Sequence, residues 1–387
     1  MAAKVNTVDH KAIISAKFDK AWDHIVKLQK HHMMPSSHKI HTPRVITKKL
    51  VKEILKNTDT TNNILVLYNV EFILELLEQN RLMGANTSQE NITFLSDDKE
   101  KTDFVKKMGV KVITELPTNE KFDIVIGNPP YTDGTHGKAT IWDKFIEKAM
   151  SMSNTVAFVV PSSLAQSNNY RSLRRRINDN GLGAVEFLPS ETFPDVTVET
   201  LYFVTASNAK PYDGDVWFKP KLKSIIEKIE MVAGTEYYNK NSMLRFKSVK
   251  LTGEVGSVIA NISRHGHKIE EGKLDRDRDN HRVVTSYMSN AKCHLQAVET
   301  TLPGTGIPGS YRQMIVSSDT EANNIRTYLK SNFCVALYEL TKTSRSIDGP
   351  QTRFIPMMDF TREWTSADIY NHFGLTAEEI AYLEENV

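Results

Sequence analysis

The chain has 387 residues, which corresponds to two or three domains if a domain takes roughly 150 residues. With 40% hydrophobic and 25% charged residues, its composition is that of a globular protein and excludes a disordered or collagen-like chain. The net charge of +2 neither favours nor excludes a nucleic-acid partner, which has to be judged from local charge.

Cysteine content and hydropathy exclude further classes. Cys293 and Cys334 are too few for a disulfide framework or a four-thiolate zinc site, and this usage favours a reducing compartment. No run approaches the roughly 18 apolar residues of a membrane span, and residues 1–10 lack the apolar core of a signal peptide. We therefore expect a cytoplasmic protein without a membrane partner.

Helical periodicity dominates the beginning of the chain. Residues 1–35 are expected to form a helical arm, because apolar side chains recur there near helical spacing until Pro35. A second helix is expected from Val45 to Leu55, with Pro43 close to its first turn, where proline is tolerated.

An alternation of strands and helices follows. Such an alternation predicts an α/β fold with a doubly wound, mostly parallel, Rossmann-like sheet, which binds ligands beyond the carboxyl ends of its strands. The expected strands are 63–67, 92–95, 110–113, 122–126, 155–160, 184–188 and 198–205, and the expected helices are 72–80, 99–108 and 141–150.

The alternation stops near residue 209, where the sequence becomes more irregular and more basic. We therefore expect a catalytic α/β domain over residues 36–208 and a second domain, of α+β type, over residues 209–387.

The strongest chemical signal is Gly127-Asn128-Pro129-Pro130-Tyr131, directly after an expected strand. The two prolines fix the backbone, so Asn128 and Tyr131 are held at the carboxyl edge of the sheet. The Asn128 side-chain oxygen and the Pro129 carbonyl can accept hydrogen bonds from an exocyclic amine, while Tyr131 offers a ring on which a base can stack. A rigid turn is the simpler interpretation of two prolines alone.

These residues resemble the Asn-Pro-Pro-Tyr motif of amino-group DNA methyltransferases that make N6-methyladenine, in the Eco57I-like class of restriction-modification and phage enzymes. The resemblance covers about residues 40–206, and the remainder resembles the recognition half of such enzymes. It implies S-adenosylmethionine as cofactor, an adenine flipped out of double-stranded DNA as substrate, and 209–387 as a target-recognition domain.

Further family landmarks occur in the expected order. The resemblance implies that Thr42 and Pro43 close over the cofactor, that Asp97 or Asp98 binds the ribose, and that Glu115 binds the cofactor's adenine. It also implies that Phe193 is the second aromatic residue, which stacks on the flipped base opposite Tyr131.

One segment departs from the family pattern. The first strand of the family ends in a glycine-rich loop, where small residues let the backbone approach the cofactor, but residues 68–72 contain no glycine. Either Asn69 and Glu71 substitute in holding the cofactor, or the site no longer binds it well.

Clustered arginines are the candidate DNA contacts, since guanidinium groups bind phosphates and would make binding salt-sensitive. A solvated helix face is the alternative interpretation of the first cluster. No metal site is expected, because His265 and His267 lack a second pair of ligands at a fitting spacing. The candidates are Arg171, Arg174, Arg175 and Arg176, followed by Arg264 and Arg312.

The leading hypothesis is therefore a site-specific DNA adenine-N6 methyltransferase. The alternative is a methyltransferase-fold protein of weak or no activity that binds DNA or a restriction-modification partner, such as a cognate restriction enzyme. Methylation of a protein glutamine and a fused endonuclease are less favoured. The recognition sequence, the oligomeric state and the bacterial or phage origin stay open.

Overall fold

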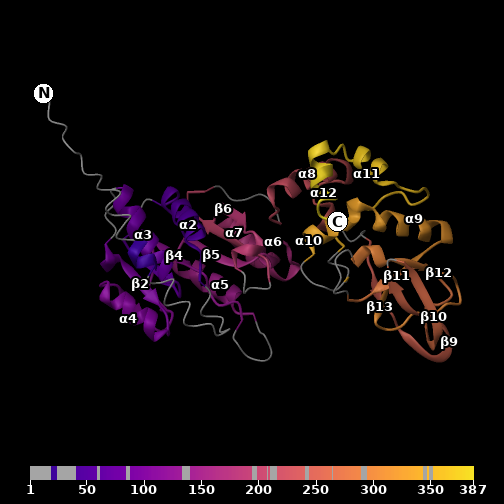
Figure 1. Cartoon of the computed structure of the whole chain (residues 1–387), viewed down its shortest axis with the longest axis horizontal. Coiled ribbons are helices and arrows are strands. Elements are labelled where there is room, and N and C mark those ends of the chain that lie inside the picture. Colours follow the sequence, from indigo (N-terminus) through magenta and orange to yellow (C-terminus); the bar gives the residue numbers. More distant parts are fainter. Residues whose placement is uncertain are drawn as a thin grey trace. The chain divides into compact units, whose positions relative to one another are not determined.

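The structure is a computed structural model with two compact units, residues 1–217 and 218–387 (Figure 1). The parts of the chain that it describes are residues 19–23, 41–58, 62–83, 88–132, 140–193, 198–206, 208–209, 216–239, 244–263, 265–288, 294–342, 347 and 352–387.

The first unit contains a seven-stranded sheet with the order β3-β2-β1-β4-β5-β7-β6. The first five strands along the chain are parallel, and β7 lies antiparallel between β5 and β6. This confirms the predicted doubly wound, mostly parallel sheet. The strands are β1 (Ile64–Leu67), β2 (Ile92–Leu95), β3 (Lys111–Ile113), β4 (Ile124–Gly127), β5 (Thr155–Pro161), β6 (Leu182–Phe187) and β7 (Thr200–Thr205).

Both faces of this sheet are covered, because its central strands are mostly apolar, are buried at every position and project side chains alternately to either side. One apolar cluster joins a sheet face to α2 (Arg44–Lys56), α3 (Val70–Met83) and α4 (Lys99–Lys107). The other joins the opposite face to α5 (Trp142–Met152), α6 (Ser163–Gln166) and α7 (Arg171–Asp179).

The boundary between the units falls between Trp217 and Phe218, whereas the sequence placed it between 208 and 209. Trp217 explains the difference. Its ring is buried against Phe203 of β7, and its indole nitrogen donates to Asn178 Oδ1 at 2.9 Å. The connecting segment therefore returns to the core of the first unit before the chain leaves it.

The second unit is of α+β type, as predicted. It contains a four-stranded sheet of order β12-β11-β13-β8 and a separate two-stranded hairpin. The sheet consists of β8 (Lys247–Ser248), β11 (His281–Ser286), β12 (Glu299–Thr301) and β13 (Tyr311–Val316), and the hairpin of β9 (Leu251–Ser263) and β10 (Gly266–Asp275). The helices are α8 (Pro220–Ala233), α9 (Asp319–Lys330), α10 (Asn332–Thr341), α11 (Ser366–His372) and α12 (Ala377–Glu384).

A buried ion pair ties the hairpin to that sheet. Arg282 of β11 and Asp275 of β10 are both fully buried, and their side chains meet at 2.7 Å. Asp275 compensates the charge of the guanidinium, and Arg282 also donates to Gln313 and Thr301, so further N–H groups are bonded within the core.

Of the predicted helical arm, only residues 19–23 are described, and they are helical. Trp22 lies in the same apolar cluster as α2 and α3. Within the described ranges, none of the helices is both long enough and apolar enough for a membrane span.

Candidate active site

The candidate site lies where the chain reverses its direction of winding. β1 pairs with β2 on one side and with β4 on the other, so the segments that leave β1 and β4 diverge beyond the carboxyl ends of these strands. This is the switch point at which doubly wound sheets bind ligands. Asn69 follows β1 there, and Asn128 follows β4.

Gly127 allows these two segments to approach each other. It pairs with Leu67 in the register of β4 and β1. A Cβ atom on residue 127 would lie 2.7 Å from Leu67 Cβ and 2.8 Å from the Leu67 carbonyl oxygen. Glycine is therefore required by the close backbone contact, and it fixes the position at which Asn128 leaves the sheet.

Asn128 is buried, and its amide has one edge bonded and one edge vacant. The Nδ2 atom donates to Thr42 Oγ1 at 3.2 Å. The Oδ1 atom is fully buried and has no hydrogen-bond partner among the described residues. A buried acceptor without a partner is costly unless a ligand supplies a donor.

Thr42 is held in place by the start of α2. Pro43 precedes the helix, and its carbonyl accepts from the backbone N–H groups of Ile46 and Thr47 at 2.9 and 3.0 Å. The Thr47 hydroxyl donates to the Pro43 carbonyl at 3.1 Å. The structure thus brings Thr42 into contact with Asn128.

On the other side, His41 anchors the same segment to α3. His41 Nδ1 lies 2.5 Å from Glu71 Oε1, and Glu71 is buried. Burial would raise the pKa of Glu71, but the hydrogen bond from His41 and the positive charges of His41 and Lys101 outweigh it and lower that pKa. Glu71 therefore stays ionised and holds the segment before Thr42 rather than facing outward.

The glycine-free segment after β1 adopts a turn that glycine ordinarily makes. Tyr68 has a φ of +62°, a left-handed backbone conformation that residues other than glycine rarely adopt. Lys101 of α4 donates to the Tyr68 carbonyl at 3.0 Å, and the Tyr68 ring meets Phe145 edge to face at 5.7 Å. These contacts stabilise the turn without a glycine.

Lys101 was not identified from the sequence. Its position in the first turn of α4 opposes the helix dipole, and this was a usable signal that the amine has another role.

The two aspartates after β2 have different surroundings. Asp98 caps α4 by accepting from the Lys101 backbone N–H at 3.1 Å. Asp97 is exposed. Burial raises the pKa of Tyr68 to about 12, and the negative charge of Asp97 contributes to that rise. Glu115 is exposed in the segment after β3. Asp97 and Glu115 thus follow β2 and β3, strands that pair with each other beside β1.

The two aromatic rings predicted to flank a base lie in different apolar clusters. Tyr131 packs in the cluster of α5, and Phe193 packs in the cluster of α2 on the other face of the sheet. Both are buried. The Tyr131 hydroxyl is buried without a hydrogen-bond partner among the described residues, and burial raises its pKa.

The arginines of α7 are not equivalent. Arg174 is fully buried and donates to the carbonyls of Leu164 and Ser167 at 2.5 and 2.8 Å, so it holds the α6–α7 connection and is not available to a phosphate. Arg175 and Arg176 are exposed, and Arg176 pairs with Glu147 at 2.9 Å. Arg171 is half-buried at the start of the helix.

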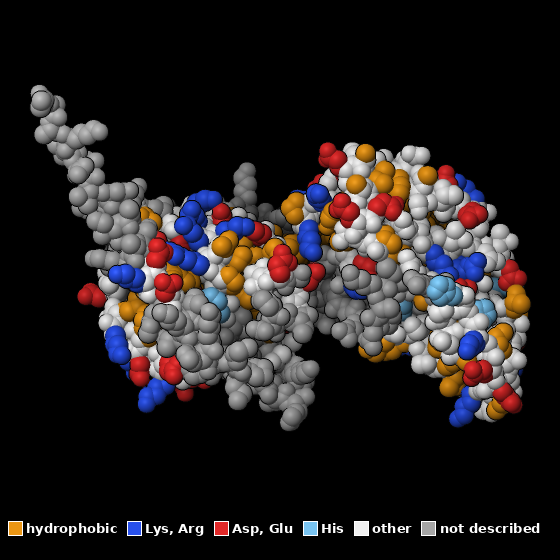
Figure 2. Space-filling model, viewed as in Figure 1, with side chains coloured by type: hydrophobic (Ala, Val, Ile, Leu, Met, Phe, Trp, Pro, Cys, Tyr) orange, Lys and Arg blue, Asp and Glu red, His pale blue; other side chains and the backbone are white. Residues whose placement is uncertain are grey.

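In the second unit, the Arg312 guanidinium stacks 3.8 Å from the ring centre of Tyr287. Arg264 lies outside the described residues. Figure 2 shows Lys and Arg side chains interspersed with Asp and Glu on the visible face. The described part of the chain contains no group of three or more His, Cys, Asp or Glu side chains fit to hold a metal ion.

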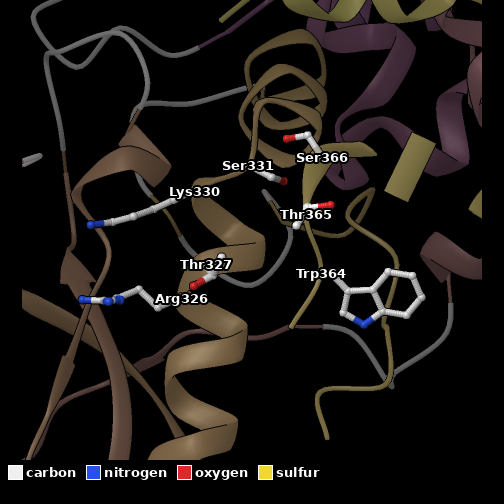
Figure 3. A pocket seen from close by; sticks show the side chains of 7 residues that line it. All are labelled: Arg326, Thr327, Lys330, Ser331, Trp364, Thr365 and Ser366. Carbon is white, nitrogen blue, oxygen red and sulfur yellow. The ribbon is translucent and has the colours of Figure 1, made fainter. Parts of the chain in front are cut away.

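A groove of about 470 Å³ lies in the second unit between α9 and the start of α11 (Figure 3). Arg326 and Lys330 line it from α9, but their head groups point away from Trp364. Both pair with the buried carboxylate of Glu299, at 3.0 and 2.7 Å. These cations therefore stabilise the join between α9 and β12.

Comparison with solved structures gives distant likenesses. A Listeria monocytogenes protein described as a class I S-adenosylmethionine-dependent methyltransferase is 13% identical, with 56% of this chain and 78% of that chain covered and a TM-score of 0.40. The type I restriction-modification methyltransferase subunit of Streptococcus thermophilus is 15% identical, with 44% and 45% covered and a TM-score of 0.34. The type IIG restriction endonuclease BpuSI is 8% identical, with 90% and 66% covered and a TM-score of 0.41.

Among curated proteins, no sequence matches this chain. A family model does match, and its description is Eco57I restriction-modification methylase. The match begins in α2, includes the segment with Asn128 and ends within β6. Residues 46–185 therefore match an Eco57I restriction-modification methylase domain.

Proposed function

We propose that this protein is a site-specific DNA adenine-N6 methyltransferase, which transfers a methyl group from S-adenosylmethionine to an adenine flipped out of duplex DNA. The observation that carries the proposal is the vacant acceptor Asn128 Oδ1, buried beside the switch point of the sheet. An exocyclic amine is a hydrogen-bond donor of the kind that this oxygen lacks.

The residues at the strand ends fit S-adenosylmethionine. Asp97 and Glu115 are exposed carboxylates, which suit ribose hydroxyls and an adenine amino group, respectively. Asn69 is buried directly after β1, where the methionine end would lie. When bound, S-adenosylmethionine supplies a methyl group on a positively charged sulfur, which leaves as a neutral thioether.

In this mechanism Asn128 Oδ1 and the Pro129 carbonyl accept the two amine hydrogens and orient the nitrogen lone pair. The nitrogen gains positive charge as its new bond to carbon forms, and the two acceptor oxygens stabilise that charge until a proton leaves to water. The rate enhancement then comes mainly from orientation, so a base of lowered pKa is not needed.

Stacking on Tyr131 and Phe193 requires each ring to leave its apolar cluster, so we assign stacking to the DNA-bound state. The loss of those contacts adds to the few kcal/mol that unstacking a base costs. Contacts with DNA phosphates are assigned to Arg175 and Arg176 on α7, with Arg171 beside them. Arg312 of the second unit is assigned to the same duplex, and a cognate restriction enzyme is proposed as a further partner.

The test is transfer of a tritiated methyl group to duplex DNA that contains adenine. Asn128→Ala should abolish transfer. The matched control is Asn154→Ala, because Asn154 is exposed before β5, at the opposite edge of the sheet. Equal transfer by the wild-type protein and Asn128→Ala would contradict the proposal, as would methylation of cytosine in the product.

The second candidate is a protein of weak or no activity that binds DNA or a restriction-modification partner. The glycine-free turn at Tyr68 and the separation of the two aromatic rings favour it. Calorimetric titration of S-adenosylmethionine, with and without duplex DNA, distinguishes the two. Binding in neither condition would favour the second candidate.

A further inference from the structure

We infer that Thr42 is a positioning residue for methyl transfer, which holds the Asn128 amide so that its oxygen faces the substrate amine. The inference rests on the proposed function. It differs from the role implied by family resemblance, in which Thr42 contacts the cofactor.

The chemistry of an amide makes its orientation decisive. One edge of the Asn128 side chain accepts hydrogen bonds and the other donates them, and a half-turn of the amide exchanges the two. In the structure the nitrogen edge donates to Thr42 Oγ1 at 3.2 Å, which leaves the oxygen edge as the buried, vacant acceptor. A threonine hydroxyl can donate as well as accept, so the bond to Thr42 holds the amide in place, and the substrate amine, which is a donor, favours the orientation with the oxygen towards it. In the opposite orientation an N–H group would face the N–H groups of a substrate amine, and two donors cannot bond each other.

Thr42 is suited to this task because it is itself fixed. Its side chain is fully buried, and it lies between two anchors. His41 is held by Glu71 on α3, and Pro43 leads directly into α2, whose inward face is buried. The hydroxyl that meets Asn128 is therefore set by the fold before any ligand binds.

The bond to Asn128 also separates this role from cofactor binding. The Thr42 hydroxyl already accepts a hydrogen bond from Asn128 Nδ2, so we assign it to the amide and not to the cofactor. Its loss should therefore slow the chemical step while leaving binding almost unchanged.

The variants that test the inference are Thr42→Val, which keeps the shape and removes the hydroxyl, and Thr42→Ser, which keeps the hydroxyl. We expect Thr42→Val to lower kcat about 10-fold. This factor corresponds to the upper end of the net free energy that one neutral hydrogen bond contributes. KM values for DNA and S-adenosylmethionine should stay within about twofold, and Thr42→Ser should restore kcat. A weaker affinity for S-adenosylmethionine with an unchanged kcat would overturn the inference.

A second measurement does not depend on turnover. In protein labelled with ¹⁵N-asparagine, the side-chain amide signal of Asn128 is identified by its absence in Asn128→Ala. Thr42→Val should shift that signal and speed its hydrogen exchange, whereas Thr42→Ser should leave it near the wild-type position. An unchanged signal in Thr42→Val would overturn the inference. If the wild-type protein transfers no methyl group while the signal shifts as expected, the proposed function fails and the contact itself stands.

Discussion

Replacement of Gly127 by alanine tests whether the close approach of β1 and β4 builds the site. The added Cβ would lie 2.7 Å from Leu67 Cβ and 2.8 Å from the Leu67 carbonyl oxygen. Carbon atoms in contact prefer about 3.5–4.0 Å, so the strands would have to separate by roughly 1 Å. The carbonyl oxygen belongs to the backbone and cannot rotate away as a side chain can.

The magnitude follows from the cost of overpacking. Forcing extra atoms into a packed core costs about 1–3 kcal/mol, and the rigid backbone places this case near the upper end. Alanine also has less conformational freedom than glycine in the unfolded chain, and this stabilises the folded state by about 0.4–1 kcal/mol. We therefore expect a net loss of about 2 kcal/mol. For a unit of this size, that lowers the melting temperature by roughly 4–8 °C.

The matched control is Gly183→Ala on β6 of the same sheet, where the nearest atoms to an added Cβ lie at 3.5 Å, an ordinary contact distance. The melting temperature of each variant is measured from the hydrogen exchange of peptides of the first unit as the temperature is raised. The kcat of each variant is measured by methyl transfer to DNA. Because Asn128 is the next residue, displacement by up to 1 Å should lower kcat of Gly127→Ala by as much as about 100-fold. A melting temperature within 1 °C of that of the control would refute the steric reasoning.

Three further predictions concern single side chains. Arg174→Met should destabilise the first unit by about 1–3 kcal/mol in chemical denaturation, because two carbonyls lose their donor. Its control, Arg175→Met, should leave stability within about 0.5 kcal/mol. Arg175→Met should instead reduce the slope of log binding constant against log salt concentration for DNA by about one unit. Cys334 is buried, and burial raises its pKa to about 12 despite hydrogen bonds from its neighbours, so a maleimide should label it only after unfolding, as mass spectrometry of its peptide would show. Burial opposes ionisation of Glu379, but its bonds to Lys228 and neighbouring groups lower its pKa to about 2. A carboxyl whose pKa is lower in the folded than in the unfolded protein stabilises the fold at pH values above the unfolded pKa of about 4.3. The free energy of unfolding should therefore fall as the pH drops from about 4 towards 2. Glu379→Gln should flatten that dependence in hydrogen exchange of α8.

The central sheet was predictable because its strands are short apolar runs separated by amphipathic helices. The insertion of β7 between β5 and β6 was not, since strand order depends on how segments distant in sequence pair. The burial of Arg174 could have been recognised. It lies beside Leu173 and three residues before Ile177, on the apolar face of α7.

The site was predictable in part. The motif at Asn128 and the segment with Thr42 were both singled out from the sequence, and the structure places them in contact. The left-handed turn at Tyr68 was not predicted, because a tyrosine carries no local preference for positive φ and depends on Lys101 and Phe145 for support. One of the two alternatives for residues 68–72 had Glu71 help to hold the cofactor, and in the structure the Glu71 carboxylate contacts His41.

The packing of Trp217 also constrains how the chain folds during synthesis. The first unit cannot complete its core until Trp217 has been synthesised, because Phe203 and Asn178 lie against its ring. At roughly 5–20 residues per second, translation of 217 residues takes about 11–43 s. Until then the face of β7 that Trp217 covers is open to other apolar surfaces in the cell, so a pause in translation shortly before residue 217 would prolong the period in which a chaperone has to protect the nascent chain.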